Sequence, residues 1–374
     1  MEKNPLTIFQ LFGAFTAGTL FMTWRNHLSL KMNLLGYIFD RIELFPNFVS
    51  IKNEKESMEL LQRHRRSWYL GEILSYLDGP RMAKQKDFQI PSREVGRTIL
   101  VRVYQPKLTQ KVNELPIVLF VHGGGWSFGS IQVYDNLVRS IAEASQCIFA
   151  SVEYRLSPEH KFPNGLQDCE DALKWISGHP AELFQQEFPM ASKTKLGICG
   201  DSAGGNYCAS LAVFAKNSGI NLAIQCLIYP ATSAFCIPHW RQPPLPLSTD
   251  SAVLYSQGPL LNFSPIVWGW NLYLSDPNQA YDPRASPILY SLEDLKDTAP
   301  AFVVTAGCDM LKDEAFNYAK KLEEAGVKVE YRNYPNTIHA FLSLHFSDFR
   351  GEIHGDLCQA LRAAFSNNTP SSFL

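Results

Sequence analysis

The chain has 374 residues, of which 46% are hydrophobic, 12% aromatic and 19% charged, and its formal net charge is −2 at pH 7. This composition is typical of a globular protein and excludes a fibrous or disordered chain. Because basic residues are not in excess, the chain has no general positive field, and we expect no nucleic-acid partner.

The eight cysteines are scattered, without a C-x-x-C pair or a His/Cys cluster at zinc spacing. We therefore expect no metal site. Several cysteines lie in apolar, strand-like runs, where a cysteine behaves as a small hydrophobic residue. They are expected to be mostly reduced, buried thiols, with one disulfide left open as an alternative.

Residues 4–24 carry no charged side chain, and a segment of this length can cross a bilayer. Threonine and glutamine side chains dilute its apolarity, and no A-x-A-like cleavage site is evident. Arg25, Lys31 and Arg41 follow the segment and Lys3 precedes it, so the charge bias does not settle an orientation. Two interpretations stay open. One is a membrane-associated protein, for example of the endoplasmic reticulum, and the other is a cytoplasmic protein whose first helix covers a pocket.

Residues 25–90 are expected to form lid helices, because charged and apolar side chains recur with a helical period in EKESMELLQRHRRSWYLGEILSYL. The basic cluster of Arg63, His64, Arg65 and Arg66 is interpreted as a solvated helix face.

From residue 91 onward, apolar strand-like runs alternate with helix-like segments. The strand-like runs are RTILVRVYQP, LPIVLFVH, CIFASVEY, KLGICG, AIQCLIYP, PAFVVTAG and VKVEYRNYP. This alternation predicts an α/β domain over 91–366 with a mostly parallel sheet flanked by helices. An insertion at about 238–286, rich in Pro, Trp and Tyr, is expected to complete the lid over the carboxyl edge of the sheet. Residues 367–374 read as a frayed tail.

A G-x-S-x-G pattern at 200–204 lies between a strand-like run and a helix-like run. A strand that turns abruptly into a helix holds a serine in a strained conformation with its hydroxyl exposed. The helix N-terminus favours the negative charge that develops during attack. The pattern alone is common by chance, but its setting makes Ser202 the candidate nucleophile.

A serine nucleophile needs a base that a carboxylate orients, in the chain order Ser, Asp or Glu, His. The run AFVVTAG leads to Asp309, and the next strand-like run leads to a loop with His339. Both should emerge at the sheet edge that carries Ser202. The later His345 and His354 are interpreted as surface or packing residues, and the alternative role of Asp309 is to cap the following helix.

The sequence HGGGW at 122–126 directly follows the strand-like run PIVLFV. An attacked carbonyl oxygen becomes an oxyanion, which needs backbone donors already in place. Three consecutive glycines allow N–H groups to approach a ligand closely. The alternative is a flexible turn, but flexibility alone would not explain a run of three glycines in a chain that also has a G-x-S-x-G turn.

With these motifs the chain resembles the hormone-sensitive lipase-like branch of the α/β-hydrolase fold, which includes arylacetamide deacetylases and many microbial carboxylesterases. The motifs HGGG[FW], EYRL-x-PEH-x-FP, GDSAGGN, D-x-L-[RK]-DE and H-[GA]-F are matched at 122–126, 153–163, 200–206, 309–314 and 339–341. The resemblance covers about 90–365. It implies Ser202 as nucleophile, His339 as base and Asp309 as orienting acid.

The resemblance also implies an oxyanion hole from the N–H groups of Gly124, Gly125 and Ala203. The adjoining Trp126 and Asp201 are expected to contact the substrate. The resemblance further implies a lid that is formed by the N-terminal residues and the insertion. Departures from the family motifs, a lysine at position 312 and an alanine at position 340, remove no catalytic atom.

These features predict a cofactor-independent serine carboxylesterase for short- to medium-chain acyl esters of small or hydrophobic alcohols, acting through an acyl-enzyme on Ser202. Amide deacetylation and hydrolysis of lipid esters at a membrane surface are alternatives with the same catalytic residues. A non-catalytic ligand receptor of the same fold is a third, against which the retained Ser202, Asp309 and His339 argue. The oligomeric state is not predicted.

Overall fold

The computed structural model of the chain describes residues 56–63, 65, 80–178, 181–234, 250–258, 260–343 and 350–366. The uncharged segment 4–24, most of the expected N-terminal lid and the tail at 367–374 lie outside the described residues. Within the described part of the chain, no helix combines the length and the apolarity that a bilayer crossing requires.

A sheet of eight strands forms the centre of the described chain, in the spatial order β1-β2-β4-β3-β5-β6-β7-β8. The strands are β1 (Lys84–Pro91), β2 (Thr98–Gln105), β3 (Leu115–Val121), β4 (Ile148–Val152), β5 (Ala191–Asp201), β6 (Ile224–Ile228), β7 (Ala301–Ala306) and β8 (Val329–Tyr334). β2 pairs antiparallel with both β1 and β4, whereas every other pair is parallel. The predicted α/β fold with a mostly parallel sheet is confirmed.

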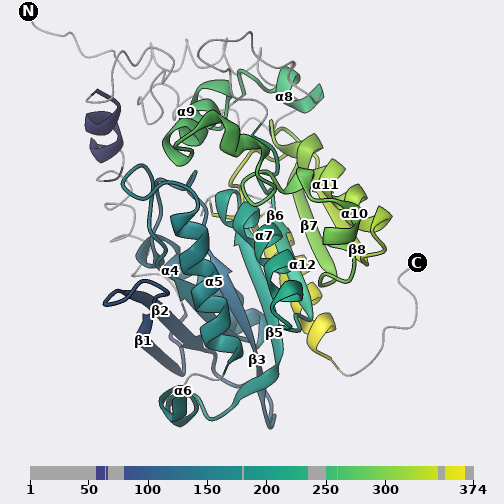
Figure 1. Cartoon of the computed structure of the whole chain (residues 1–374). Coiled ribbons are helices and arrows are strands. Elements are labelled where there is room, and N and C mark those ends of the chain that lie inside the picture. The colour runs from purple at the N-terminus through teal and green to yellow at the C-terminus, as the bar shows by residue number, and fades with distance from the viewer. Residues whose placement is uncertain are drawn as a thin grey trace, which may run out of the picture.

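Helices connect the strands and cover both faces of the sheet (Figure 1). They are α4 (Ile131–Ser145), α5 (Asn164–Ser177), α6 (Ala181–Glu187), α7 (Ala203–Asn217), α8 (Asp250–Leu254), α9 (Phe263–Tyr273), α10 (Leu292–Leu295), α11 (Lys312–Glu324) and α12 (Arg350–Phe365), with the 3-10 helices η2 (Pro277–Tyr281) and η3 (Pro287–Leu289).

The two faces of the sheet pack into two separate hydrophobic cores. In β3, Ile117 and Leu119 belong to the core that α5, α7 and α11 cover, whereas Val118 and Phe120 belong to the core under α4 and α12. Alternate residues of a strand point to opposite faces. A central strand that is buried on both faces therefore reads as a continuous apolar run, as LPIVLFV does.

The first strand corrects the expectation that residues 25–90 are all helical. β1 begins at Lys84, so the sheet starts seven residues before the predicted boundary at 91. Phe88 and Ile90 are buried while Gln89 between them is exposed, and this alternation is that of an edge strand with one buried face. The two-residue period of KQKDFQIP is hard to recognise in the sequence, because its first four residues are charged or polar and its apolar residues are few.

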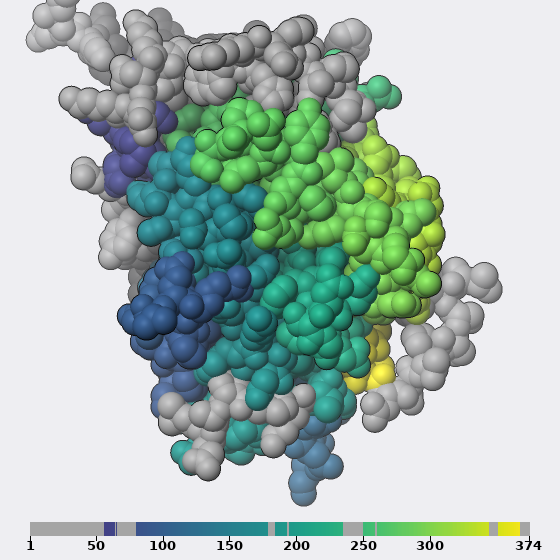
Figure 2. All heavy atoms as spheres, viewed as in Figure 1, coloured from purple at the N-terminus to yellow at the C-terminus, as the bar shows by residue number. Residues whose placement is uncertain are grey.

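The described parts of the N-terminal region and the insertion contact each other. Leu61 of the helical residues 56–63 packs in one small hydrophobic cluster with Trp268 and Leu272 of α9. The indole N–H of Trp268 donates to the hydroxyl of Ser57 over 2.9 Å. Figure 1 shows this helical segment and α9 at the same end of the molecule, and in Figure 2 the described, green part of the insertion lies directly against the body of the domain.

The basic cluster at 63–66 is not simply a solvated face. Arg65 donates hydrogen bonds to the carbonyls of Ser127 and Ser157 and to the carboxylate of Glu159. The reason is that two loops of the α/β domain present these acceptors beside the N-terminal helical segment, which a linear pattern cannot reveal. Arg63 is exposed, as expected, and residues 64 and 66 lie outside the described residues.

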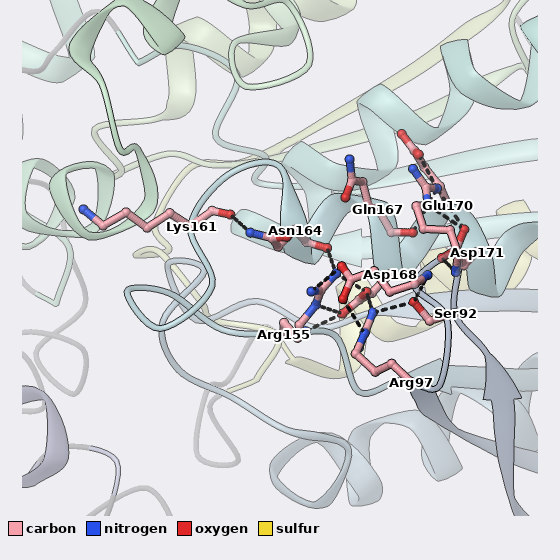
Figure 3. A network of polar contacts seen from close by, with 11 residues as sticks. Ser92, Arg97, Arg155, Lys161, Asn164, Gln167, Asp168, Glu170 and Asp171 are labelled. Atoms are coloured by element: carbon pink, nitrogen blue, oxygen red, sulfur yellow. Dashed lines mark hydrogen bonds and ion pairs between the residues drawn. The ribbon is translucent and has the colours of Figure 1, made fainter.

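The motif EYRLSPEHKFP anchors the loop after β4 through a network of ion pairs (Figure 3). The fully buried carboxylate of Asp168, on α5, accepts from Arg155 Nε and Nη2 over 2.9 Å each, and it also accepts from Arg97. Beside it, Arg93 pairs with Glu170 over 2.6 Å and with Asp171 over 2.9 Å. The network ties the β1–β2 turn, the loop and α5 together at one corner of the sheet.

Seven cysteines fall among the described residues, and all seven are buried thiols. Burial raises the pKa of Cys147 and of Cys358 to about 12. Such thiols stay protonated at neutral pH and act as small apolar side chains.

Candidate active site

Ser202 occupies a sharp turn between β5, which ends at Asp201, and α7, which begins at Ala203. Its φ of 53° and ψ of −117° lie in a region that non-glycine residues rarely adopt. The flanking glycines make this turn possible. A Cβ at Gly204 would come within 2.0 Å of the carbonyl oxygen of Val121, and one at Gly200 within 2.5 Å of the carbonyl oxygen of Gly204.

The structure brings the three predicted catalytic side chains into one hydrogen-bonded chain. His339 Nε2 lies 2.9 Å from Ser202 Oγ, and His339 Nδ1 lies 2.7 Å from Asp309 Oδ2. Asp309 follows β7 and His339 follows β8, so parallel strands deliver both to the edge where β5 ends. Asp309 is buried, with 1% of its surface exposed, and His339 is 6% exposed.

Asp309 also fills part of the alternative role that its position suggested. Its second carboxylate oxygen, Oδ1, accepts a hydrogen bond of 3.0 Å from the backbone N–H of Leu311 at the start of α11. One oxygen therefore contacts His339 while the other fixes the carboxylate to the backbone, and this holds the orientation of both groups.

Among the described residues, the other late histidine, His354, does not join this chain of contacts. His354 lies on α12, where its Nε2 is 3.1 Å from the hydroxyl of Ser140 on α4. It is a packing residue between two helices, as expected. His345 lies outside the described residues.

The loop at 122–128, here called the oxyanion loop after the role that the sequence predicts for it, follows β3 and passes beside the turn at 200–204, called the nucleophile turn after the predicted role of Ser202. Gly124 and Gly125 have positive φ angles of 117° and 56°, and a Cβ at Gly124 would come within 2.4 Å of the carbonyl oxygen of Phe128. The carbonyl oxygen of Gly124 accepts a 2.8 Å hydrogen bond from the N–H of Phe128. Ala203 opens α7, where the first N–H groups of a helix have no intrahelical acceptor.

Asp201 braces this loop from behind. Its Oδ1 accepts from the backbone N–H of Gly123 over 2.8 Å, and its Oδ2 accepts from the hydroxyl of Tyr134 over 3.0 Å. Only 2% of its surface is exposed, and burial raises its pKa to about 6. We expected Asp201 to contact the substrate, but both of its oxygen atoms contact protein donors.

Trp126, the other residue expected to contact the substrate, packs inside the domain. Its ring stacks on Tyr273 with centroids 4.5 Å apart and lies 4.1 Å from the ring of Trp270. Both partners belong to α9, and only 1% of the Trp126 surface is exposed. This aromatic contact joins the oxyanion loop to the insertion.

Two supporting residues were not singled out from the sequence. His122 is fully buried between the rings of Tyr134 and Tyr154, and its Nδ1 donates to the carbonyl oxygen of Gly123 over 2.8 Å. Burial lowers its pKa to about 4, so the ring is neutral. The position of His122 at the head of HGGGW was the only available signal.

Glu314 is the second of these residues and lies in the motif DMLKDE. Its carboxylate accepts from the backbone N–H of Thr232 over 2.6 Å and of Ser233 over 3.1 Å. Burial raises its pKa to about 8. Glu314 thereby fixes the loop after β6. This loop borders the nucleophile turn, where the N–H of Ser202 donates to the carbonyl oxygen of Ile228 over 2.9 Å.

Among the described residues, no group of three or more histidine, cysteine, aspartate or glutamate side chains is arranged to hold a metal ion. The acidic and imidazole groups of the site contact one another, the backbone and the hydroxyls of Ser202 and Tyr134.

Residues 118–343 match the model of a protein family whose description is "alpha/beta hydrolase fold". The chain belongs to this α/β-hydrolase family. The match spans the oxyanion loop, the nucleophile turn, Asp309 and His339. The resemblance predicted from the motifs is therefore confirmed.

Curated relatives within the α/β-hydrolase family carry esterase names. The carboxylesterase NlhH of Mycobacterium tuberculosis is 34% identical over 267 residues, which cover 69% of this chain and 76% of that protein. An arylesterase of Saccharolobus solfataricus is 32% identical over 260 residues, which cover 69% of this chain and 75% of that protein.

Solved structures give the same result for the fold. The carboxylesterase EstE1, cloned from a metagenomic library, is 33% identical, with a TM-score of 0.72 over 82% of this chain and 98% of its own. A hyperthermophilic esterase of the archaeon Pyrobaculum calidifontis is 30% identical, with a TM-score of 0.75 over 90% of this chain and 98% of its own.

Proposed function

We propose that the chain is a serine carboxylesterase that hydrolyses esters through an acyl-enzyme on Ser202. The observation that carries this proposal is the chain of contacts from Ser202 Oγ to His339 Nε2, at 2.9 Å, and from His339 Nδ1 to Asp309, at 2.7 Å. The esterase names of the relatives and of the similar structures support the same reaction class.

In the acylation step, the hydroxyl of Ser202 donates its proton to Nε2 of His339 as its oxygen attacks the ester carbonyl. Asp309 accepts from the Nδ1–H, which holds the ring in the tautomer that leaves Nε2 free to act as the base. The imidazolium that forms is stabilised by the buried carboxylate. His339 then gives the proton to the departing alcohol, and the acyl group remains on Ser202.

In the deacylation step, a water molecule takes the place of the alcohol. His339 accepts a proton from this water as its oxygen attacks the acyl carbonyl, and the proton returns to Ser202 Oγ as the acid leaves. Both steps pass through a tetrahedral oxyanion, for which we assign the N–H groups of Gly124, Gly125 and Ala203 as donors. The braced oxyanion loop keeps these donors in place before the charge develops.

The substrate is proposed to be a short- to medium-chain acyl ester of a small or hydrophobic alcohol. The N-terminal residues and the insertion are proposed to form a lid over the site, and the aromatic-rich composition of the insertion favours an apolar alcohol or acyl group. Asp201 beside the oxyanion loop and Trp126 within it are assigned supporting roles, since their contacts are with protein groups.

Two experiments test the proposal. Purified protein is incubated with a fluorophosphonate probe, which should label Ser202 in the wild type and leave Ser202→Ala unlabelled. A panel of p-nitrophenyl esters of graded acyl length should then show turnover that falls beyond medium chain length and that the Ser202→Ala variant lacks. Absence of both labelling and turnover in the wild type would favour a ligand receptor of the same fold, and faster cleavage of matched anilides would favour an amide deacetylase.

A further inference from the structure

Arg65 connects the N-terminal helical segment to the oxyanion loop. Its guanidinium makes four hydrogen bonds to groups 62 to 94 residues away in the sequence. Nε donates to the carbonyl oxygen of Ser127 over 2.8 Å, and Nη2 donates to that of Ser157 over 2.8 Å. The carboxylate of Glu159 receives Nη1 at 2.6 Å and Nη2 at 3.0 Å. This planar fork geometry is specific to arginine, because lysine has a single ammonium group.

Ser127 is not an arbitrary acceptor, because its peptide group continues toward the candidate oxyanion donors. The carbonyl of Ser127 and the N–H of Phe128 belong to one planar peptide. That N–H donates to the carbonyl oxygen of Gly124 over 2.8 Å. The carbonyl of Gly124 and the N–H of Gly125 in turn belong to one planar peptide. A chain of two peptide groups therefore runs from the Arg65 guanidinium to the N–H of Gly125.

Such a chain transmits both position and polarisation. The N–H of Ser127 also donates to the carbonyl oxygen of Gly124, over 3.1 Å. Displacement of the Ser127 backbone would therefore carry both donors away from Gly124 and would turn the Gly125 N–H with them. Hydrogen bonds arranged in series also strengthen one another, and a charged donor at the start makes the last N–H a better donor. Both effects act on the group that we assign to the oxyanion.

The ion pair with Glu159 keeps the guanidinium in place. Burial favours the neutral form of the Glu159 carboxyl and is the largest single effect, but the hydrogen bond and charge of Arg65, a backbone hydrogen bond and the charge of His160 together outweigh it, so the pKa of Glu159 is lowered. The loop of Glu159 also supports the oxyanion loop directly, since the N–H of Ser157 donates to the carbonyl oxygen of Trp126 over 2.9 Å. The N-terminal segment, the loop after β4 and the oxyanion loop thus meet at one guanidinium.

We infer that Arg65 is a positioning residue for ester hydrolysis, which orients and polarises the Gly125 N–H toward the oxyanion through the peptides of Ser127 and Gly124. This inference rests on the proposed serine-esterase function. It also gives the N-terminal segment a role in the chemical step, in addition to covering the site.

The test uses the full chain and three variants, Arg65→Ala, Arg65→Lys and, as a matched control, Arg63→Ala, whose side chain is exposed two residues earlier. Loss of a whole oxyanion donor lowers kcat by about 10²–10³. Weakening one donor should therefore lower kcat of Arg65→Ala by about tenfold, with KM within about threefold of the wild type. The kcat of Arg65→Lys should lie between those of Arg65→Ala and the wild type. The kcat of Arg63→Ala should stay within about twofold of the wild type.

A trifluoromethyl ketone inhibitor supplies the readout that a purely structural role would not change. Its adduct on Ser202 carries the oxyanion, so its inhibition constant should rise in Arg65→Ala by the same factor as kcat falls. Millimolar guanidinium should restore part of the activity that Arg65→Ala has lost. It should leave the activity of Arg63→Ala unchanged. All rates are expressed per active site, as titrated with the fluorophosphonate probe, so that a loss of folded protein does not count.

The inference is overturned if Arg65→Ala retains kcat per active site within twofold of Arg63→Ala, or if kcat falls while the ketone binds as tightly as before. If Arg65→Ala does not fold, Arg65→Lys decides on the same two readouts. A wild-type protein that neither hydrolyses esters nor reacts with the probe would instead contradict the proposed function, and this inference with it.

Discussion

The carboxylate of Asp201 accepts a hydrogen bond of 2.8 Å from the backbone N–H of Gly123, so the residue before Ser202 holds the loop at 122–128. This contact links the two halves of the candidate site, β5 with its turn and the loop after β3, and β3 and β5 are neighbouring parallel strands. A carboxylate buried at such a junction has consequences that can be measured.

Replacement of Asp201 by asparagine should change the pH dependence of stability. Burial raises the folded-state pKa of Asp201 from 3.8 to about 6, so the folded protein holds this proton more tightly than the unfolded chain. The stability linked to this proton is present below pH 4 and is lost as the pH rises through 6. Urea unfolding between pH 4 and 7 should show Asp201→Asn gaining about 3 kcal/mol relative to the wild type across this range. Glu324→Gln, at an exposed position, is the control. If the unfolding free energies of the wild type and Asp201→Asn change in parallel with pH, the prediction is wrong.

The Asp309→Asn variant should retain the fold and lose most of its activity. An amide at this position can present N–H to the imidazole and favour the tautomer that has no free base at Nε2. We expect kcat to fall by about 10⁴, the loss that the same change causes in the serine protease triad. Ester turnover per folded protein measures it, with thermal unfolding as the control for structure. Activity within tenfold of the wild type would show that another carboxylate orients His339.

The glycine at 204 should be irreplaceable for steric reasons. A Cβ there would come within 2.0 Å of the Val121 carbonyl oxygen, which belongs to the backbone of β3 and cannot move aside easily. Gly204→Ala should therefore destabilise the protein by about 3 kcal/mol or more, or prevent folding. Gly355→Ala, on α12 with no atom within 4 Å of its added Cβ, is the matched control and should be neutral or gain up to about 1 kcal/mol. Equal melting temperatures for both variants would refute the argument.

The ion-pair network around Asp168 should matter for stability rather than for turnover. Asp168 is fully buried and accepts from two arginines, so Asp168→Asn leaves their charges poorly compensated and should cost about 3 kcal/mol. Glu94→Gln, with a 45% exposed side chain in the same network, should cost far less, because water screens an exposed ion pair. Denaturant unfolding gives both values, and kcat per active site should be unchanged in both. A larger loss in Glu94→Gln than in Asp168→Asn would mean that solvent-exposed pairs hold this corner.

Much of the fold and of the candidate site could be predicted from the sequence because it follows local patterns. Buried strands read as apolar runs, and the order of Ser202, Asp309 and His339 after successive strands placed them at one sheet edge, where the structure brings them together. The glycines of the elbow were explicable from crowding alone. These signals are short in range, so a linear reading captures them.

Other features depend on which segments become neighbours, and a linear reading could not supply them. The start of β1 is charged, and its two-residue period emerges only when β2 pairs with it. Arg65 acquires its acceptors from loops more than 60 residues away, and the carboxylate of Asp201 faces Gly123 because β3 and β5 are adjacent. Each of these contacts joins elements that are separated in the sequence.

The central claim is that Ser202 carries the acyl group during turnover, and intact-protein mass spectrometry tests it most directly. The protein is mixed with p-nitrophenyl acetate or butyrate and quenched in acid within milliseconds, before the steady state. We predict a mass increase of one acyl group, located by peptide mapping on Ser202, with a burst of p-nitrophenol of equal amplitude. Full ester turnover by Ser202→Ala, or an acyl group that maps to another residue, would contradict the account.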